Sequence, residues 1–412
     1  MMPRMNTRYL LMILGASIPS FIAAMSFDNR FIPLLQRPRL TVDGTRSSFW
    51  VQGFATTANK SFNEMQQDIP LAEISGKFDQ VELARGIVSL GFPNPLPSEF
   101  QILDKLPWEV SGKRQAQGFA ITWDQYIAEW ISTGVSLFFM RVQSRHLFKL
   151  DAVNMEPSIS LKPGDAVLLD DSRRSMLQQV GICEGSTEQL GMGDIDWYFR
   201  VGSMWEYAYR FRRIDAGLRL GLLIPAGVSR EINRPASIPF GGNGHWGMYG
   251  EIDALFELRE DWKAGLLLRL NNRFSRRDTQ RMPGAKEPDI FGAVVGDARV
   301  DPGVTAIFVP YFLLENLRAG LSLGVNYNLA WHQKDSWANL SSCTAKLDDV
   351  ERLSKWSSEY FTINVFYDFG KMKVKRDFNP ILTFQWDVPS SLFISSRVNR
   401  AHRVSIGFDF VY

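Results

Sequence analysis

Residues 317–332, LRAGLSLGVNYNLAWH, decide the fold that the sequence predicts. Apolar side chains occupy every second position from Leu317 to Trp331, and the positions between them carry small or polar residues such as Arg318 and Asn326. Successive side chains of a β-strand point to opposite faces, so this alternation predicts one strand with an apolar face and a polar face. Its sixteen residues exceed the five or six that are usual for strands of globular proteins.

The same two-residue period recurs along the chain and predicts a protein built from strands. Twelve segments show it, at residues 46–57, 114–124, 129–147, 195–210, 213–225, 245–259, 261–275, 302–314, 316–332, 358–370, 374–387 and 400–412. An aromatic content of 13%, with 29 Phe and 12 Trp, also favours strands.

The joins between these segments alternate between short and long. The short joins lie at residues 125–128, 211–212, 260, 315 and 371–373. Antiparallel strands that cross a membrane repeatedly give this pattern, with short periplasmic turns and long outer loops. Both chain ends then lie on the side of the short turns, which requires an even number of strands, and about twelve strands are predicted.

Residues 58–113 do not fit the pattern and leave three interpretations open. FDQVELARGIVSLG has the pattern of a short amphipathic helix, and FPNPLPSEF is a loop punctuated by prolines. The segment can be an outer loop, an inward-folded plug, or an extra hairpin that raises the number of strands to fourteen. We favour a loop or a plug.

The polar face of the predicted strands carries many charges. The residues predicted to line a pore are Arg219, Glu251, Asp253, Lys263, Arg269, Arg273, Arg318, Asn326 and Asp368. Unpaired charges are costly in a dry core, whereas a wet lumen solvates them while the apolar face meets lipid. Closure of the sheet leaves no unpaired edge in the hydrocarbon. The predicted fold class is therefore all-β, a transmembrane antiparallel up-and-down β-barrel.

Aromatic residues on the apolar face form two groups. Trp197, Trp246, Trp331 and Trp386 lie near the long-loop ends of their segments, and Trp123, Trp262, Phe369 and Tyr412 lie near the short-turn ends. Aromatic girdles at both membrane interfaces are typical of such barrels.

The N-terminus has the pattern of an export signal. Arg4 and Arg8 precede the apolar run YLLMILGA, Pro19 breaks it, and small residues follow. We expect a signal peptide at 1–26 and an outer-membrane β-barrel at 27–412; an uncleaved anchor is the alternative. Without Arg4 and Arg8, 44 basic residues balance 44 acidic ones. This neutral charge gives no reason to expect a nucleic-acid partner.

Two cysteines, Cys183 and Cys343, fall in long joins on the same predicted side of the barrel. Exported proteins often carry disulfides, so one hypothesis joins these two residues, and the other leaves two free thiols.

The C-terminal segment RVSIGFDFVY resembles the last strand of bacterial outer-membrane proteins, which ends in an aromatic residue and is bound by the barrel assembly machinery. Phe408, Phe410 and Tyr412 match that assembly signal. The resemblance implies that this strand closes the barrel and that the machinery is a partner.

The middle of the chain resembles the outer-membrane channel family associated with meta-pathway degradation of phenol and aromatic hydrocarbons, itself distantly similar to fatty-acid and toluene channels. The matching elements are Gly191, Gly193, Asp194, Pro225, Gly227, Gly241, Gly242 and Gly244. The resemblance covers residues 190–332 and the tail, and it implies passive uptake of small, hydrophobic or aromatic solutes in the outer membrane. Strand ends and bends need glycine and proline in any barrel, so these residues are also explained by architecture alone.

We therefore predict a channel embedded in outer-membrane lipid that passes a small-molecule solute. A structural or adhesin-like barrel that acts through its loops is the alternative. An enzyme is not expected, because no hydrolase signature surrounds His146, His245, His332 or His402. No cofactor or metal is expected either, because the sequence has no phosphate loop and its two cysteines lie far apart.

Overall fold

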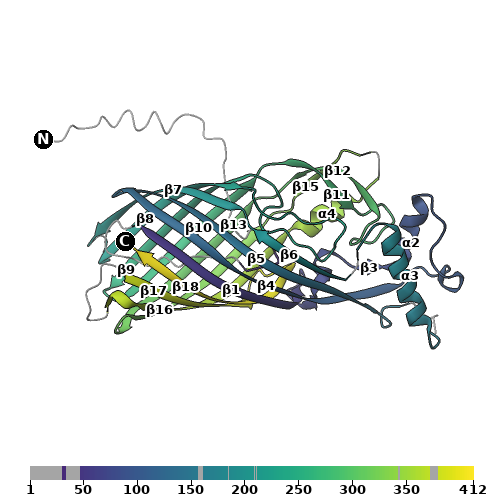
Figure 1. Cartoon of the computed structure of the whole chain (residues 1–412), viewed down its shortest axis with the longest axis horizontal. Coiled ribbons are helices and arrows are strands. Elements are labelled where there is room, and N and C mark those ends of the chain that lie inside the picture. Colours follow the sequence, from purple (N-terminus) through teal and green to yellow (C-terminus); the bar gives the residue numbers. More distant parts are fainter. Residues whose placement is uncertain are drawn as a thin grey trace.

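A computed structural model describes residues 30–33, 47–155, 161–183, 185–207, 209, 211–341, 344–371 and 379–412. Its main feature is a closed antiparallel barrel of twelve strands (Figure 1). These are β1 (Ser48–Phe62), β4 (Pro107–Ala128), β5 (Ile131–Leu150), β7 (Ile195–Glu206), β8 (Arg213–Ile224), β9 (Gly247–Arg259), β10 (Trp262–Arg273), β13 (Thr305–Arg318), β14 (Leu321–His332), β16 (Trp356–Asp368), β17 (Asn379–Ser390) and β18 (Val398–Val411). Because β1 pairs with both β4 and β18, the barrel closes, which confirms the predicted fold and excludes fourteen strands.

The strand connections follow the predicted alternation in length except at the last pair, where ten residues (369–378) separate β16 from β17 and only seven (391–397) separate β17 from β18. Connections of at most six residues join β4 to β5, β7 to β8, β9 to β10 and β13 to β14. They lie at the end of the barrel that also holds the C-terminus (Figure 1). The long connections gather at the opposite end, which we call the outer end.

The remaining elements decorate the barrel. The short strands are β2 (Asp68–Pro70), β3 (Phe78–Asp79), β6 (Ser186–Met192), β11 (Arg276–Met282), β12 (Val294–Asp301) and β15 (Ser336–Asn339). The helices are α2 (Gln80–Ser89), α3 (Asp165–Gln179) and α4 (Leu347–Ser354), and the 3₁₀ turns are η1 (Leu71–Ser75), η2 (Ser98–Phe100) and η3 (Phe369–Lys371). Strands β11, β12 and β15 form a separate sheet at the outer end.

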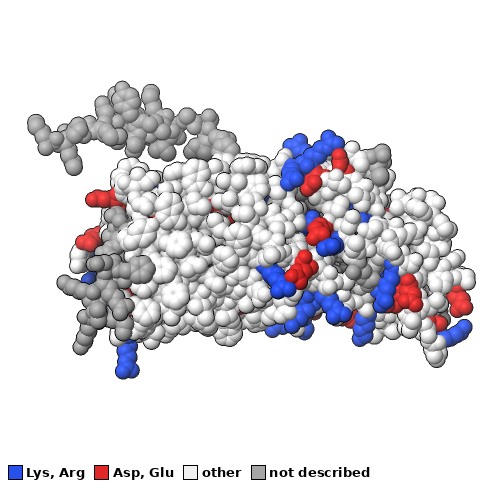
Figure 2. Space-filling view, viewed as in Figure 1, with Lys and Arg blue, Asp and Glu red and all other residues white. Residues whose placement is uncertain are grey.

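The barrel wall is inside out compared with a soluble β-protein. On β8 and β9 the outward residues Leu220 and Ile252 are 58% and 51% exposed, while the inward Glu251 and Asp253 are at most 4% exposed. Figure 2 shows a band without charged residues along the barrel and a concentration of Lys, Arg, Asp and Glu at the outer end. The outside of the wall is therefore suited to lipid.

The turn between β13 and β14 corrects one prediction. The alternation over 317–332 is not one strand, because Ala319 and Gly320 form a turn with φ of 44° and 92° and β14 begins at Leu321. The predicted join at residue 315 is therefore wrong as well. A turn of two residues keeps the two-residue period intact, so the apolar pattern continues through it.

Aromatic side chains cover both rims of the outer surface. All the tryptophans predicted to form girdles are exposed, from 39% at Trp197 to 51% at Trp246. At the short-turn rim, the Trp123 indole donates a hydrogen bond of 2.9 Å to the Tyr412 hydroxyl across strand β1. Together with the apolar band, this is the architecture of outer-membrane barrels, and the chain is an outer-membrane β-barrel.

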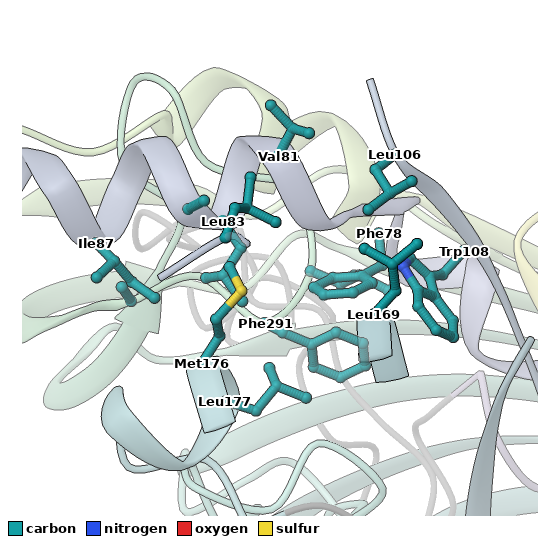
Figure 3. Close-up of a cluster of buried hydrophobic side chains, with 14 of the residues drawn as sticks. Phe78, Val81, Leu83, Ile87, Leu106, Trp108, Leu169, Met176, Leu177 and Phe291 are labelled. Carbon is teal, nitrogen blue, oxygen red and sulfur yellow. The ribbon is translucent and has the colours of Figure 1, made fainter. Parts of the chain in front are cut away.

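Part of the segment 58–113 forms a cap at the outer end. The Asp79 side chain accepts hydrogen bonds from the amides of Val81 and Glu82 and begins α2. Leu83 and Ile87 on one face of α2 are fully buried against α3 (Figure 3). The hydrophobic cluster also includes Val110 of β4 and Phe291, and it therefore joins long loops to the extended end of the barrel wall.

Another part of this segment enters the barrel mouth. Turn η1 packs on β1, β4 and β18, and Leu71 lies with the inward-facing Ala58 and Ala401. Residues 58–113 therefore combine an outer cap with one turn inside the mouth. The predicted signal peptide at 1–26 lies outside the described residues and stays a prediction.

Candidate functional site

The charged residues predicted for the lumen pair with one another across β8, β9 and β10. The register places Arg219 opposite Glu251, and Glu251 opposite Arg269. Arg219 Nη1 lies 2.9 Å from one carboxylate oxygen of Glu251, and Arg269 binds the other oxygen. One carboxylate thus binds two guanidinium groups. Positive and negative side chains therefore alternate across β8, β9 and β10 and pair with one another.

The same pairing extends along neighbouring strands. Arg200 on β7 binds Asp253 at 2.9 Å and Asp215 at 3.0 Å. Near the short turns, Lys263 Nζ lies 2.7 Å from Glu315. The predicted residues on this wall are therefore brought together as ion pairs, and their role in permeation stays a prediction.

The opposite wall is lined by neutral polar groups and one ion pair. Asn364 donates to Asn326 at 3.3 Å, and Thr362 donates to Asp387 at 2.6 Å. Arg403 Nη2 lies 2.7 Å from Asp387, and both side chains are at most 2% exposed. The predicted Asn326 thus belongs to a continuous polar lining.

Two predicted residues lie at the short-turn rim instead of along the wall. Arg318 is exposed at the end of β13. Asp368 is half-buried at the end of β16 and accepts the amide of Gly370 at 2.8 Å.

The loop between β8 and β9, residues 225–246, folds into the lumen. Its side chains Ile238 and Phe240 are fully buried. The amide of Ile238 donates to the Gln189 side chain at 2.9 Å, and the amide of Phe240 donates to Val228 O at 2.8 Å. This inward loop was not predicted, because the sequence showed only one of the long joins, at residues 226–244.

A buried carboxylate seats the inward loop. Asp194 accepts the amides of Gly227 at 3.2 Å and Gly242 at 2.8 Å, and it pairs with Arg273 at 2.8 Å. A Cβ atom on Gly242 would lie 1.8 Å from the Arg273 guanidinium. The glycines and the aspartate that were far apart in the sequence motifs therefore meet at one point.

The inward loop completes an apolar cluster that spans the lumen. Its wall members come from opposite sides of the barrel, among them Phe138 on β5 and Val309 on β13. Ile238 and Phe240 lie between these walls in the same cluster. The lumen is thus obstructed by side chains in this conformation.

Residues 30–33, which precede β1, also lie inside the barrel. Asn399 donates its amide to Arg30 O at 2.9 Å, and Arg403 Nη1 donates to Pro33 O at 2.7 Å. Both partners belong to β18. Phe31 packs against the apolar cluster, and Ile32 is part of it.

A cavity of about 330 Å³ lies where these elements meet at the outer end. Its lining includes Phe31, Ile74 of η1, Phe291 and Trp356 on the apolar side. The cationic residues that line it are Arg30, Arg114, Arg230, Arg273 and Arg281, and the carboxylates are Asp289 and Asp335. This cavity is the candidate binding site.

The His332 side chain forms an arrangement that resembles a hydrolytic triad. Thr305 Oγ1 lies 2.7 Å from Nδ1 of His332, and Asp335 Oδ1 lies 3.0 Å from its Nε2. Thr305 is 1% exposed and is not among the described residues that line the cavity. The hydroxyl is therefore out of reach of a substrate in that cavity, and we assign these contacts to the packing of the wall.

Arg30, Arg114 and Arg230 were not predicted as site residues, although all three line the cavity. Arg114 and His146 had a usable signal, because the alternation places both on the inward faces of predicted strands. Arg30 and Arg230 lie in segments without periodicity, and their positions depend on long-range contacts.

The remaining predicted site residues are those of the assembly signal and the two cysteines. Phe408 and Tyr412 point outward, 40% and 56% exposed, and Phe410 stacks on Phe49 of β1. Their role in assembly stays a prediction. Cys183 is exposed, and Cys343 lies outside the described residues, so the disulfide also stays a prediction.

Within the described ranges, no helix is long and apolar enough to span a membrane. The same part of the chain contains no group of His, Cys, Asp and Glu side chains arranged to hold a metal ion.

The sequence matches no family model and no curated protein. Solved structures with a similar barrel include the COG4313 outer membrane channel from Pseudomonas putida F1, with 10% identity over 90% of this chain and 97% of that one and a TM-score of 0.48. The Pseudomonas putida toluene transporter TodX has 10% identity over 90% of each chain and a TM-score of 0.31. The β domain of the Bordetella autotransporter BrkA has 10% identity over 89% and 99%, with a TM-score of 0.35.

Proposed function

We propose that this protein is an outer-membrane channel for passive uptake of small solutes. The observation that carries the proposal is the cavity inside the barrel mouth, which has both apolar and charged lining residues. A pocket of this size and mixed lining is typical of sites for small molecules. The paired charges on β8, β9 and β10 line the lumen with polar groups, on the face of the wall opposite to the lipid-facing one.

The obstructed lumen favours a substrate-specific channel over a wide pore. Ile238 and Phe240 of the inward loop contact wall residues from both sides of the barrel. Because the loop fills the lumen while it is seated, a solute must displace this loop or pass when the loop moves. The inward loop, rather than residues 58–113 alone, is the plug in this proposal.

A structural barrel that acts through its loops is the second candidate. The cap formed by α2 and α3 supports it, because its buried residues form a hydrophobic core of their own. A protein that presents loops to a partner would benefit from such a rigid cap, and it would need no passage through the lumen.

Single-channel conductance in a planar bilayer distinguishes the two functions. We expect the refolded protein to give small, infrequent steps, and the double variant I238S/F240S to give larger and more frequent ones because it weakens the apolar cluster. The matched control is Leu90→Ser, at a 44% exposed position beside α2, which should behave as the parent. Silence in all three proteins, each shown to be folded by heat-modifiable migration on gels, would support the structural function.

A further inference from the structure

The cavity in the barrel mouth contains a group of cations without matching carboxylates. Arg30 comes from the segment before β1, Arg114 from β4 and Arg230 from the inward loop, and His146 of β5 lies beside them. None of these four side chains forms an ion pair within the described ranges of the chain. Three chain segments therefore bring positive charge to one place.

Arg114 is the most isolated of these groups. It is 5% exposed, and its Nε and Nη1 atoms have no hydrogen-bond partner among the described residues. Its guanidinium lies 4.8 Å from the centre of the Phe31 ring. The Nε2 atom of His146, which is 9% exposed, also lacks a partner in the described part of the chain. Buried polar groups without partners are rare in folded proteins, and a bound water or ion is one explanation for them.

The other two arginines are held in place by neutral groups. Arg30 donates to Leu353 O at 2.6 Å and to Ser75 Oγ at 3.2 Å. Burial and the charge of Arg230 lower the pKa of Arg30 to about 10, and burial lowers the pKa of Arg230. Arg230 keeps surface that is accessible from the cavity although protein surrounds it. The cations therefore repel one another instead of being neutralised.

The carboxylates that line the cavity also interact with groups other than these arginines, and Asp335 acts electrostatically on Arg30 as well. Asp335 binds His332 at 3.0 Å and the amide of Gly303 at 2.9 Å. Lys346 and Arg352 act electrostatically on Asp289. Arg273 is paired with Asp194, and Arg281 donates to Gly292 O at 2.9 Å and to Val180 O at 3.1 Å. The positive charges of Arg30, Arg114, Arg230 and Arg281 therefore outnumber the two carboxylates of the cavity.

We infer that this cavity binds a small organic anion, with its carboxylate at Arg114 and Arg230 and its apolar body against Phe31, Phe291 and Trp356. An arginine pair binds a carboxylate through charge-assisted hydrogen bonds, and a ligand charge there offsets the cost of burying unpaired guanidinium groups. The aromatic lining distinguishes such a ligand from inorganic phosphate. The inference deepens the proposed channel function by naming the class of solute.

Isothermal titration of the folded protein in detergent with benzoate and benzyl alcohol tests this inference. The two probes have similar size, and only benzoate is charged. We expect benzoate to bind at least tenfold more tightly than benzyl alcohol. Equal binding of the two probes, or no binding of benzoate, would overturn the inference. Inorganic phosphate that binds as tightly as benzoate would overturn the role of the aromatic lining.

Variants locate the binding site. Arg114→Gln should weaken benzoate binding at least tenfold and leave benzyl alcohol unchanged. Arg230→Gln should also weaken benzoate binding. Because Arg230 lies in the inward loop and not in the barrel wall, this variant still tests the site if Arg114→Gln fails to fold. The control Arg277→Gln affects an exposed arginine of β11 and should change neither probe. Unchanged benzoate binding in both cavity variants would contradict the assignment.

The outcome is separable from that of the proposed function. Conductance steps in potassium chloride without benzoate binding would support the channel function and contradict the anion site. Benzoate binding by a protein that never conducts would support the anion site and contradict the channel function.

Discussion

Asp194 and Arg273 form a buried ion pair, 2.8 Å between Oδ2 and Nη1, that joins the start of β7 to the end of β10 beneath the inward loop. Both side chains are at most 3% exposed. Arg273 also donates to His245 O at 2.8 Å. The pair is therefore the point where the barrel wall holds the segment that fills its lumen.

Asp194→Asn should release the inward loop. Loss of one partner from a buried ion pair leaves the other charge uncompensated and typically costs about 3–5 kcal/mol. We expect faster proteolysis within residues 229–243 and larger conductance steps. Asp297→Asn, at an exposed ion pair in the outer sheet, is the matched control and should leave both readouts unchanged. Equal rates of proteolysis in the parent and in Asp194→Asn would contradict the role of Asp194 in holding the loop.

Gly242→Ala should reproduce that effect. Its Cβ would lie 1.8 Å from the Arg273 guanidinium, so Arg273 must move away from Asp194. Gly250→Ala is the control, since its Cβ meets only a Leu220 methyl group at 3.9 Å. We expect a loss of about 1–3 kcal/mol in urea unfolding for Gly242→Ala and little change for Gly250→Ala.

The double variant of Asp194→Asn and Gly242→Ala tests whether both changes break one contact. Residues that share an interaction give non-additive free energies. The double variant should therefore lose less stability than the two single losses combined, and strict additivity would indicate two separate effects.

Glu251→Gln should destabilise the barrel and change its ion selectivity. It leaves Arg219 and Arg269 without their shared carboxylate, at a cost of about 3–5 kcal/mol. Glu188→Gln breaks an exposed pair with Arg141 and should change the stability little, because solvent screens such pairs. Urea unfolding gives the stability, and reversal potentials should shift toward anions only for Glu251→Gln.

Leu220→Arg tests the position of the membrane band. Leu220 is 58% exposed on the outward face of β8, and an arginine on the lipid face costs about 2–4 kcal/mol near the middle of the bilayer. Leu90→Arg, in the cap, should be tolerated. The fraction that folds into liposomes measures the difference, and equal folding of both variants would place Leu220 outside the hydrocarbon.

The strands could be predicted from the sequence because their pattern is local. Along each strand, apolar lipid-facing side chains such as Leu220 alternate with polar lumen-facing ones such as Glu251. This two-residue period identifies the strands of the barrel wall. Strand ends are less certain, as the turn at Ala319 and Gly320 shows, because a two-residue turn preserves the period.

The contents of the lumen could not be predicted in the same way. The inward loop is held by Asp194, which precedes Gly242 by 48 residues, and Arg30 is held by Leu353 across 323 residues. Such contacts leave no period in the sequence. The motifs included Gly227, Gly241 and Gly242, but only the fold shows that these three lie around the Asp194 carboxylate.

The hydrogen bond between Trp123 and Tyr412 has a consequence for the order of assembly. These residues lie 289 positions apart, and their strands β4 and β18 flank β1 on its two edges. The bond can form only after β4 has docked on β1 and the end of the chain has arrived at the other edge. Contacts between such distant residues form late and slowly. This bond therefore ties together the two strands that flank β1, at the place where the barrel closes.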